Sequence, residues 1–320
     1  MTQSVERALA AFCPLLPVGV ALSGGADSVA LLHLCAQKWP GQVFALHINH
    51  GLQRAAADFE AHCREMCEQL GVPILVRTVD AAKRAGQSPE DAARAARYKA
   101  LSGLALVEYK HCAIKSIAIA QHADDQVETL LLALGRGAGL AGMSAMPAHW
   151  QRDGLHYYRP LLGVAGADIR LWLAERKLAF VEDPSNLDER FTRNGIRARV
   201  MPAIRAVFPH FLDTFSRSAA HAAQAQLALL ELASFDGQRV IDDEGGQPRI
   251  KLLQSLSRAR QANVLRHWLK SAFQTIPSTA QMEELLDQVR DCTTRGHCIH
   301  IKIGNGFVQR NGAVLTWYNP

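Results

Sequence analysis

Short apolar stretches alternate with longer amphipathic ones over the first part of the chain. Stretches rich in β-branched residues predict buried strands at 18–22, 43–48, 74–79 and 114–120. Apolar residues at helical spacing predict helices at 28–37, 55–70, 89–106 and 125–134. Such alternation is typical of β-α-β units, so we expect an α/β fold with a doubly wound parallel sheet.

The pattern is different in the last third of the chain. A stripe at roughly 3.6-residue spacing predicts one long helix through Phe211, Phe215, Ala219, Ala222, Leu229 and Leu232. Two more helices are expected at 258–273 and 279–290, and short strands at 299–303, 307–309 and 313–317. We therefore expect two domains, one at 1–216 and a smaller, mixed α+β one at 217–320.

Charge, apolar runs and cysteines limit the class of protein. The net charge of +5 fits a polyanionic partner without requiring one. No apolar run approaches the ~20 residues that cross a bilayer, and the N-terminus lacks the basic start of a signal peptide, so we expect a cytoplasmic protein without a membrane partner. Seven cysteines without a C-x-x-C pair argue against a disulfide framework and against a zinc or iron–sulfur site.

The run SGGADS directly follows the first predicted strand and opens the first predicted helix. Glycines permit a tight turn, hydroxyls add donors, and a helix N-terminus attracts anions, so this run predicts a phosphate site. The residues expected at the phosphates are Ser23, Gly24, Gly25, Ala26, Asp27 and Ser28. A Walker-type loop has a Lys directly after its last glycine, whereas Gly25 is followed by Ala26 here. A carboxylate beside phosphates requires an intervening cation, so we predict Asp27 as a Mg²⁺ ligand.

A second run, QHADDQVE at 121–128, places acidic side chains at the start of the fourth predicted helix. Asp125 and Glu128 are three residues apart and therefore share one helical face. Paired carboxylates suit an ammonium group and can accept its proton. Two other interpretations stay open at this point, namely Asp124 as a helix N-cap and an H-x-D-D metal site of a hydrolase.

The run SGGADS resembles the SGGxDS signature of the PP-loop, or N-type ATP pyrophosphatase, superfamily, whose members split ATP into AMP and pyrophosphate. Further runs resemble those of tRNA(Ile)-lysidine synthetases and occur in that family's order. They are HINHGL at 47–52, QHADDQVET at 121–129, Arg136 with Gly137 and Gly139, RPLL at 159–162, DPSN at 183–186, and Arg193 with Asn194 and Arg197. The resemblance covers roughly residues 18–200.

The resemblance implies a reaction. Free lysine would be attached to the wobble cytidine of an isoleucine tRNA with a CAU anticodon, in a reaction that needs ATP and Mg²⁺ and yields lysidine, AMP and pyrophosphate. The C2 carbonyl of cytosine is a poor electrophile, so its oxygen is first adenylated and an amine then displaces AMP. The domain at 217–320 would recognise the tRNA, and a homodimer is left open.

The resemblance also implies roles for single residues. The catalytic residues would be Asp27, Arg97, Asp125 and Glu128, and the ATP site would include His50 and His122. Arg97 is the preferred substrate contact on a predicted helix that also carries Glu90, Arg94 and Tyr98. Contacts to tRNA would come from Asp183, Arg193 and Arg197, because guanidinium groups suit backbone phosphates.

Four other functions remain to be distinguished. Within the superfamily they are a tRNA thiolase, which needs cysteines near the site, and a small-molecule ligase or amidotransferase such as an NAD synthetase. Outside it they are a metal-dependent phosphohydrolase and a non-catalytic tRNA-binding module.

Overall fold

The structure is a computed structural model that describes residues 2–49, 56–79, 89–107, 113–184, 188–242, 245–294 and 296–320. The chain divides into two compact units, Met1–Ala222 and Ala223–Pro320. Each unit has its own sheet and its own hydrophobic core. The predicted boundary, between residues 216 and 217, lies slightly earlier in the chain than the division between these units.

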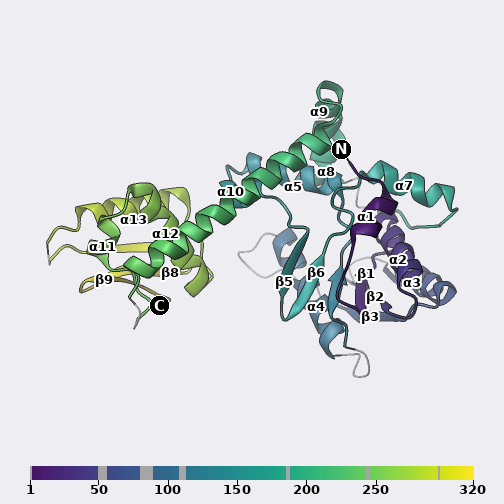
Figure 1. Ribbon diagram of the computed structural model, residues 1–320, viewed down its shortest axis with the longest axis horizontal. Helices are drawn as coiled ribbons and strands as arrows, with labels where there is room; N and C mark the ends of the chain where they lie inside the picture. The colour runs from purple at the N-terminus through teal and green to yellow at the C-terminus, as the bar shows by residue number, and fades with distance from the viewer. Residues whose placement is uncertain are drawn as a thin grey trace. The chain divides into compact units, whose positions relative to one another are not determined.

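A six-stranded sheet forms the centre of the first unit, in the order β3-β2-β1-β4-β6-β5 (Figure 1). Its strands are β1 (Val18–Ala21), β2 (Val43–Asn49), β3 (Ile74–Thr78), β4 (Ser116–Ala118), β5 (His149–Arg152) and β6 (Leu155–Tyr158). Pairing is parallel from β3 through to β6, and β5 is antiparallel to β6 at the edge. The predicted doubly wound parallel sheet is confirmed, and its order reverses between β1 and β4, where such sheets bind ligands.

Helices cover both faces of this sheet (Figure 1). The helices of the first unit that precede the long helix are α1 (Val5–Ala11), α2 (Ala26–Lys38), α3 (Ala56–Leu70), α4 (Pro89–Val107), α5 (Ala123–Gly135), α6 (Leu140–Met143), α7 (Gly166–Glu175), α8 (Thr192–Gly195) and α9 (Met201–Val207). Side chains alternate along β2, so Val43 and Ala45 pack in one core with α1, α2 and α7. Phe44 and Leu46 pack in the opposite core with α4.

The edge hairpin β5–β6 and the helices α1 and α7 are elements that the sequence pattern does not predict. Exposed and half-buried residues alternate along β5, so it contains no apolar run. The hairpin is stabilised by long-range packing instead, since the rings of Trp150 and Tyr157 stack at 5.0 Å and Tyr157 is fully buried. Such contacts are invisible to a local pattern.

The predicted long helix is α10 (Phe211–Val240), and Phe211, Ala219 and Ala222 of its stripe are buried. The division between the two units falls within this helix. No helix in the described part of the chain, this one included, is long and apolar enough to cross a membrane.

The second unit combines helices with a small antiparallel sheet, which confirms the predicted mixed α+β class. After the end of α10 it contains α11 (Ile250–Gln254), α12 (Arg258–Phe273), α13 (Thr279–Asp291), β7 (His300–Ile303), β8 (Gly306–Asn311) and β9 (Val314–Tyr318). The sheet order is β7-β8-β9. Ile303, Val308 and Leu315 of the sheet pack in one core with Leu269 and Leu285 of the helices.

Close packing requires a glycine at the first residue of β8. A Cβ atom at Gly306 would overlap the carbonyl oxygen of Tyr318 and the ring of Trp317. The carbonyl is part of the backbone, so we expect Gly306→Ala to lower the free energy of unfolding of the second unit by about 1–3 kcal/mol. Gly296→Ala is the control, because a Cβ there meets nothing within 4 Å. Denaturant titration followed by circular dichroism measures both, and equal midpoints would contradict the prediction.

Candidate functional site

The SGGADS run forms a turn between β1 and α2 that is held by its own serines. The Ser28 hydroxyl accepts a hydrogen bond from the Ser23 amide at 3.1 Å and donates one to the Gly25 carbonyl at 2.9 Å. The two hydroxyls lie 3.0 Å apart, and the Gly25 amide donates to the Ser23 hydroxyl at 3.3 Å. The hydroxyls that the sequence suggests as ligand donors therefore cross-link the turn.

Two glycines shape this turn at the start of α2. Gly24 has φ +89°, and a Cβ atom there would lie 3.2 Å from the Cys63 sulfur. Gly25 is the N-cap of α2 and provides no side-chain cap. The first amides of an α-helix lack partners within the helix and carry partial positive charge, so this arrangement suits a phosphate group.

A histidine of the neighbouring strand β2 contacts the backbone directly before the turn. The His47 Nδ1 atom is 2.9 Å from the Leu22 carbonyl, directly before the turn. Burial lowers the pKa of His47, so the imidazole is neutral at pH 7 and Nδ1 carries the donated proton. His50, predicted for the ATP site, lies outside the described residues.

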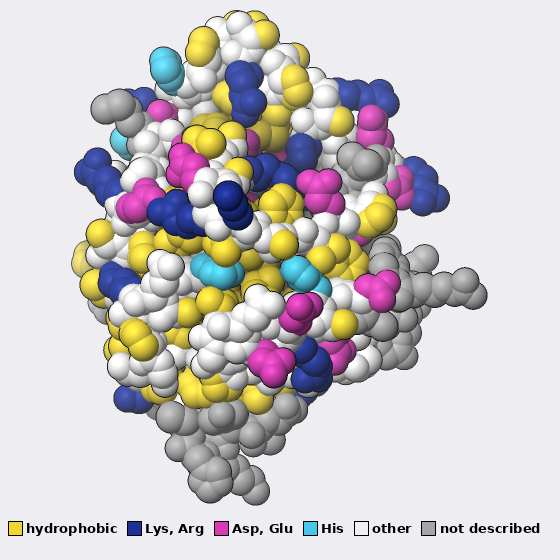
Figure 2. All heavy atoms as spheres, turned by 90° about the vertical axis from the view of Figure 1, so that its right-hand side faces the viewer, with side chains coloured by type: hydrophobic (Ala, Val, Ile, Leu, Met, Phe, Trp, Pro, Cys, Tyr) yellow, Lys and Arg dark blue, Asp and Glu magenta, His cyan; other side chains and the backbone are white. Residues whose placement is uncertain are grey.

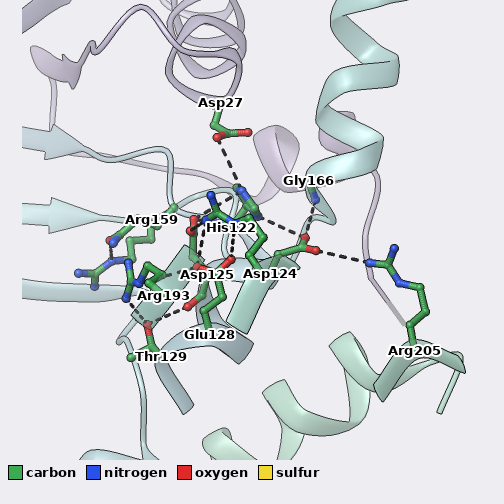
Figure 3. A network of polar contacts seen from close by, with 12 residues as sticks. Asp27, His122, Asp124, Asp125, Glu128, Thr129, Arg159, Gly166, Arg193 and Arg205 are labelled. Carbon is green, nitrogen blue, oxygen red and sulfur yellow. Dashed lines mark hydrogen bonds and ion pairs between the residues drawn. The ribbon is translucent and has the colours of Figure 1, made fainter. Parts of the chain in front are cut away.

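His122 is the centre of a charged network (Figure 3). Its Nε2 atom lies 3.7 Å from Asp27 and 3.6 Å from Asp125, and its Nδ1 atom lies 3.4 Å from Asp124. Burial alone would lower the pKa of His122, but the three carboxylates outweigh it and raise the pKa to about 9. The side chain is therefore an imidazolium at neutral pH, and it connects α2 with the start of α5.

Asp27 approaches His122 from the first turn of α2 (Figure 3). Burial raises the pKa of Asp27, and the positive charge of His122 opposes this effect only in part. The side chain is 39% exposed, so one carboxylate is available to a ligand. Among the described residues no three His, Cys, Asp or Glu side chains form a metal-binding group. A single accessible carboxylate fits Mg²⁺, which takes one or two carboxylates and completes its shell with water and phosphate oxygens.

Asp124 connects the network to α7 and α9. One of its carboxylate oxygens accepts a hydrogen bond from the Gly166 amide at 2.8 Å, and the other lies 3.7 Å from Arg205. Burial opposes ionisation of Asp124, but hydrogen bonds from His122 and Gly166 lower its pKa overall. The N-cap of α5 is His122, so the interpretation of Asp124 as the cap is wrong.

Glu128 is fully buried and forms an ion pair with Arg197. Arg197 donates to both carboxylate oxygens, at 2.7 and 3.0 Å. Burial raises the pKa of Glu128, and Arg197 counteracts part of that shift. Asp125, in contrast, is 16% exposed and lies beside His122. The two carboxylates predicted to share one face therefore have different surroundings, and Glu128 orients an arginine.

A π-helical turn, Ile196–Val200, lies between α8 and α9 and carries Arg197. Arg193, just before it, donates to the Thr129 hydroxyl at 3.1 Å and lies 3.8 Å from Glu128 (Figure 3). Both arginines predicted to contact tRNA are thus turned toward α5. Single extra turns of this kind recur at functional sites.

Other arginines of this segment are exposed, and each has a carboxylate partner. Arg190 is 89% exposed and pairs with Asp188, and Arg199 is 76% exposed and pairs with Glu189. Figure 2 shows Lys and Arg side chains gathered in the upper half of one face, with Asp and Glu side chains among them. This face therefore carries charges of both signs.

Arg159 of the RPLL run is buried and connects three segments. It donates to the Gln121 side chain, to the Pro147 carbonyl at 2.6 Å and to the Tyr98 hydroxyl at 3.1 Å. Its guanidinium group lies 3.9 Å from the centre of the Trp150 ring. A buried guanidinium with this many partners holds the sheet edge against α4.

The two remaining predicted residues lie on different segments. Arg97 is exposed on α4. Asp183 is half-buried and follows Val181, whose amide donates to the Gly24 carbonyl at 3.0 Å. The structure therefore brings the segment of Asp183 to the SGGADS turn.

Sequence reasoning missed two residues that shape the site. Gln126 is buried, and its amide group forms two hydrogen bonds of 3.0 Å with the backbone of Met146. The sequence signal that could have identified Gln126 was a polar residue on the apolar side of α5. Gly166 lies so near His122 that a Cβ atom would be 2.9 Å from the imidazole, and no local pattern marks it.

Two family models match the chain. A model described as a PP-loop domain matches residues 1–204. A model described as a TilS substrate binding domain matches residues 249–313. The first match lies within the first compact unit and the second within the other.

Curated relatives extend this match over nearly the whole chain. The chain is 55% identical to a tRNA(Ile)-lysidine synthase of Polaromonas naphthalenivorans, over 94% of this chain and 89% of the relative. It is 43% identical to the tRNA(Ile)-lysidine synthase of Pseudomonas aeruginosa, over 82% of this chain and 62% of that longer relative. A solved structure, the U34-tRNA thiolase NcsA from Methanococcus maripaludis, matches 68% of this chain and 77% of its own with a TM-score of 0.56. Its identity is 15%, which shows a shared fold alone.

The charge on His122 makes stability depend on pH. Its pKa rises from an ordinary 6.5 to about 9 in the folded protein. The stabilisation that the charged imidazole provides is therefore complete below pH 6.5 and is lost as the pH rises through 9. We expect the free energy of unfolding of the metal-free protein to fall by as much as about 3 kcal/mol over this range.

His122→Gln should remove the part of the decline in unfolding free energy that comes from His122, since glutamine does not titrate. Denaturant titrations in EDTA at several pH values measure both proteins. The same pH dependence in both would contradict the assigned charge.

Proposed function

The chain belongs to the tRNA(Ile)-lysidine synthase family, and we propose that it uses ATP to attach lysine to the wobble cytidine of an isoleucine tRNA with a CAU anticodon. The relatives' names support lysidine formation on an isoleucine tRNA, and the match to a PP-loop domain supports the use of ATP. The observation that carries the proposal is the His122 network, which joins the SGGADS turn to the acidic start of α5. A phosphate cradle and a carboxylate suited to an amine are thus parts of one site.

The first half of the reaction activates the base. The cytosine O2 atom would attack the α-phosphorus of ATP, and the bond to pyrophosphate would break. The amides at the start of α2 would face the phosphates. Asp27 would hold Mg²⁺, which when bound neutralises the charge that develops on pyrophosphate.

In the second half, an amino group of lysine would attack C2 and AMP would leave with the oxygen. We assign the lysine ammonium and its proton to Asp125, which is the more accessible of the two predicted carboxylates. Glu128 would position Arg197, whose side chain is 43% exposed and whose Nη2 atom lies 3.6 Å from Asp125. Arg197 can then stabilise negative charge on the departing AMP.

Further groups would bind the RNA. Arg97 remains our proposed substrate contact on α4, and Asp183 and Arg193 remain proposed near the tRNA. We also assign the region 217–320 to tRNA recognition, and the similarity of residues 249–313 to a substrate binding domain supports this. The reaction would take place in the cytoplasm.

The other candidate functions have less support. A thiolase shares the fold at 15% identity, whereas two lysidine synthases share 55% and 43%. Fold alone does not select a reaction, but sequence identity of this extent identifies the family.

Incubation with radiolabelled lysine, ATP and an isoleucine tRNA transcript tests the proposal directly. Label should enter the RNA, and AMP and pyrophosphate should be released. A transcript with uridine at the wobble position is the control. No incorporation by the intact chain would overturn the proposed function.

Asp27→Asn should lower the rate of pyrophosphate release about 100-fold or more, because an amide binds Mg²⁺ poorly beside phosphates. Asp58→Asn is the matched control, since Asp58 lies in the first turn of α3. A coupled pyrophosphate assay measures both. A near wild-type rate in Asp27→Asn would argue against the metal assignment.

Asp125→Asn should raise the KM for lysine more than the KM for ATP, because the carboxylate is assigned to the ammonium group. Asp168→Asn, in the first turn of α7, serves as the control. Steady-state kinetics with each substrate varied in turn gives both constants. Equal increases would indicate a metal ligand instead.

A further inference from the structure

The sheet of the second unit has one face in the core and one face turned outward. Ile303, Val308 and Leu315 are buried in the core. Side chains alternate along a strand, so their neighbours lie on the opposite face. The residues of that outer face are His300, Lys302, Phe307, Gln309, Thr316 and Tyr318, all exposed or half-buried.

Three aromatic rings lie side by side on this outer face, and we refer to His300, Phe307 and Tyr318 as the aromatic face. The ring planes are inclined to one another by 4°, 24° and 28°, and the centroids are 4.8, 5.7 and 6.4 Å apart. In a column of three stacked rings the outer two would be about twice the stacking distance apart. The three separations are similar here, so the rings form a compact, laterally offset stack and not a single column.

The aromatic face is separate from the aromatic residues of the core. Trp317 stacks on Phe273 at 4.8 Å, on the inner side of the sheet. Tyr318, the next residue, is 37% exposed. Its hydroxyl is 3.1 Å from His300 Nε2, which keeps the two rings in one orientation.

A positively charged side chain lies beside the aromatic face. Lys302 is exposed and pairs in register with Phe307, so it lies on the same side of the sheet. The chain from residue 299 to residue 320 contains no Asp or Glu. Flat rings with a cation at their margin are complementary to a nucleobase and its phosphate.

We propose that the aromatic face binds an unpaired nucleotide of the RNA substrate, with the base stacked on the rings and the phosphate beside Lys302. Sequence-tolerant binding of single-stranded RNA commonly uses aromatic side chains on an open sheet together with basic residues. This inference rests on the proposed function, and it names the surface by which the second unit engages RNA.

The test uses the full chain and a single-stranded RNA hexamer that contains 2-aminopurine, whose fluorescence falls when it stacks. We expect wild-type protein to quench the probe and Tyr318→Ala to bind it about tenfold more weakly. Tyr318→Phe is the matched control, because it keeps the ring. Lys302→Gln should weaken binding and reduce its dependence on salt.

The same variants separate this inference from the proposed function. We expect Tyr318→Ala to raise the KM for tRNA while kcat is retained, with a circular dichroism melt like that of the wild type. If that variant unfolds, His300→Gln and Lys302→Gln supply the comparison. Unchanged hexamer affinity in these variants would overturn the inference even if lysine is incorporated. Loss of self-association in Tyr318→Ala, without loss of RNA binding, would assign the face to a second copy of the chain and also overturn it.

Discussion

The first unit depends on the positive charge of His122, which lies among three carboxylates. His122 lies within 3.7 Å of the carboxylates of Asp27, Asp124 and Asp125, and these carboxylates belong to α2 and α5. Without the imidazolium, Arg197 and Arg205 would still neutralise part of the charge, but the repulsion among the three acids would increase in this partly buried site. With it, the SGGADS turn, the start of α5 and the start of α7 are held in a fixed relation, since Asp124 also binds the Gly166 amide.

Local sequence patterns were sufficient to predict most of the fold. The predicted helices and strands of the β-α-β units were found because each depends on periodicity within its own segment. The edge hairpin was not found, because Trp150 and Tyr157 form a pair only after the strands have met. The site shows the same limit. The SGGADS and QHADDQVE runs pointed to the correct elements. The pairing of Glu128 with Arg197 joins residues far apart in the chain, so no local pattern indicated that this carboxylate is buried.

A basic composition does not by itself create a basic surface here. Arg190, Arg199 and Arg205 each lie next to a carboxylate, and Arg197 is bound to Glu128. Pairs of this kind give little net field at a distance. These four arginines are therefore less available to a polyanion than their number suggests. The segment from residue 299 to residue 320, in contrast, contains no Asp or Glu of its own.

The serine cross-links of the SGGADS turn have a consequence for affinity. Four hydrogen-bonding contacts fix this turn within the folded chain, so its conformational entropy is lost during folding and not when a nucleotide arrives. Binding energy is then available for the ligand instead of for ordering the loop. A free peptide with this sequence would lack that advantage. The turn is thus preorganised, and the stability of the surrounding sheet is a determinant of how tightly the phosphates are held.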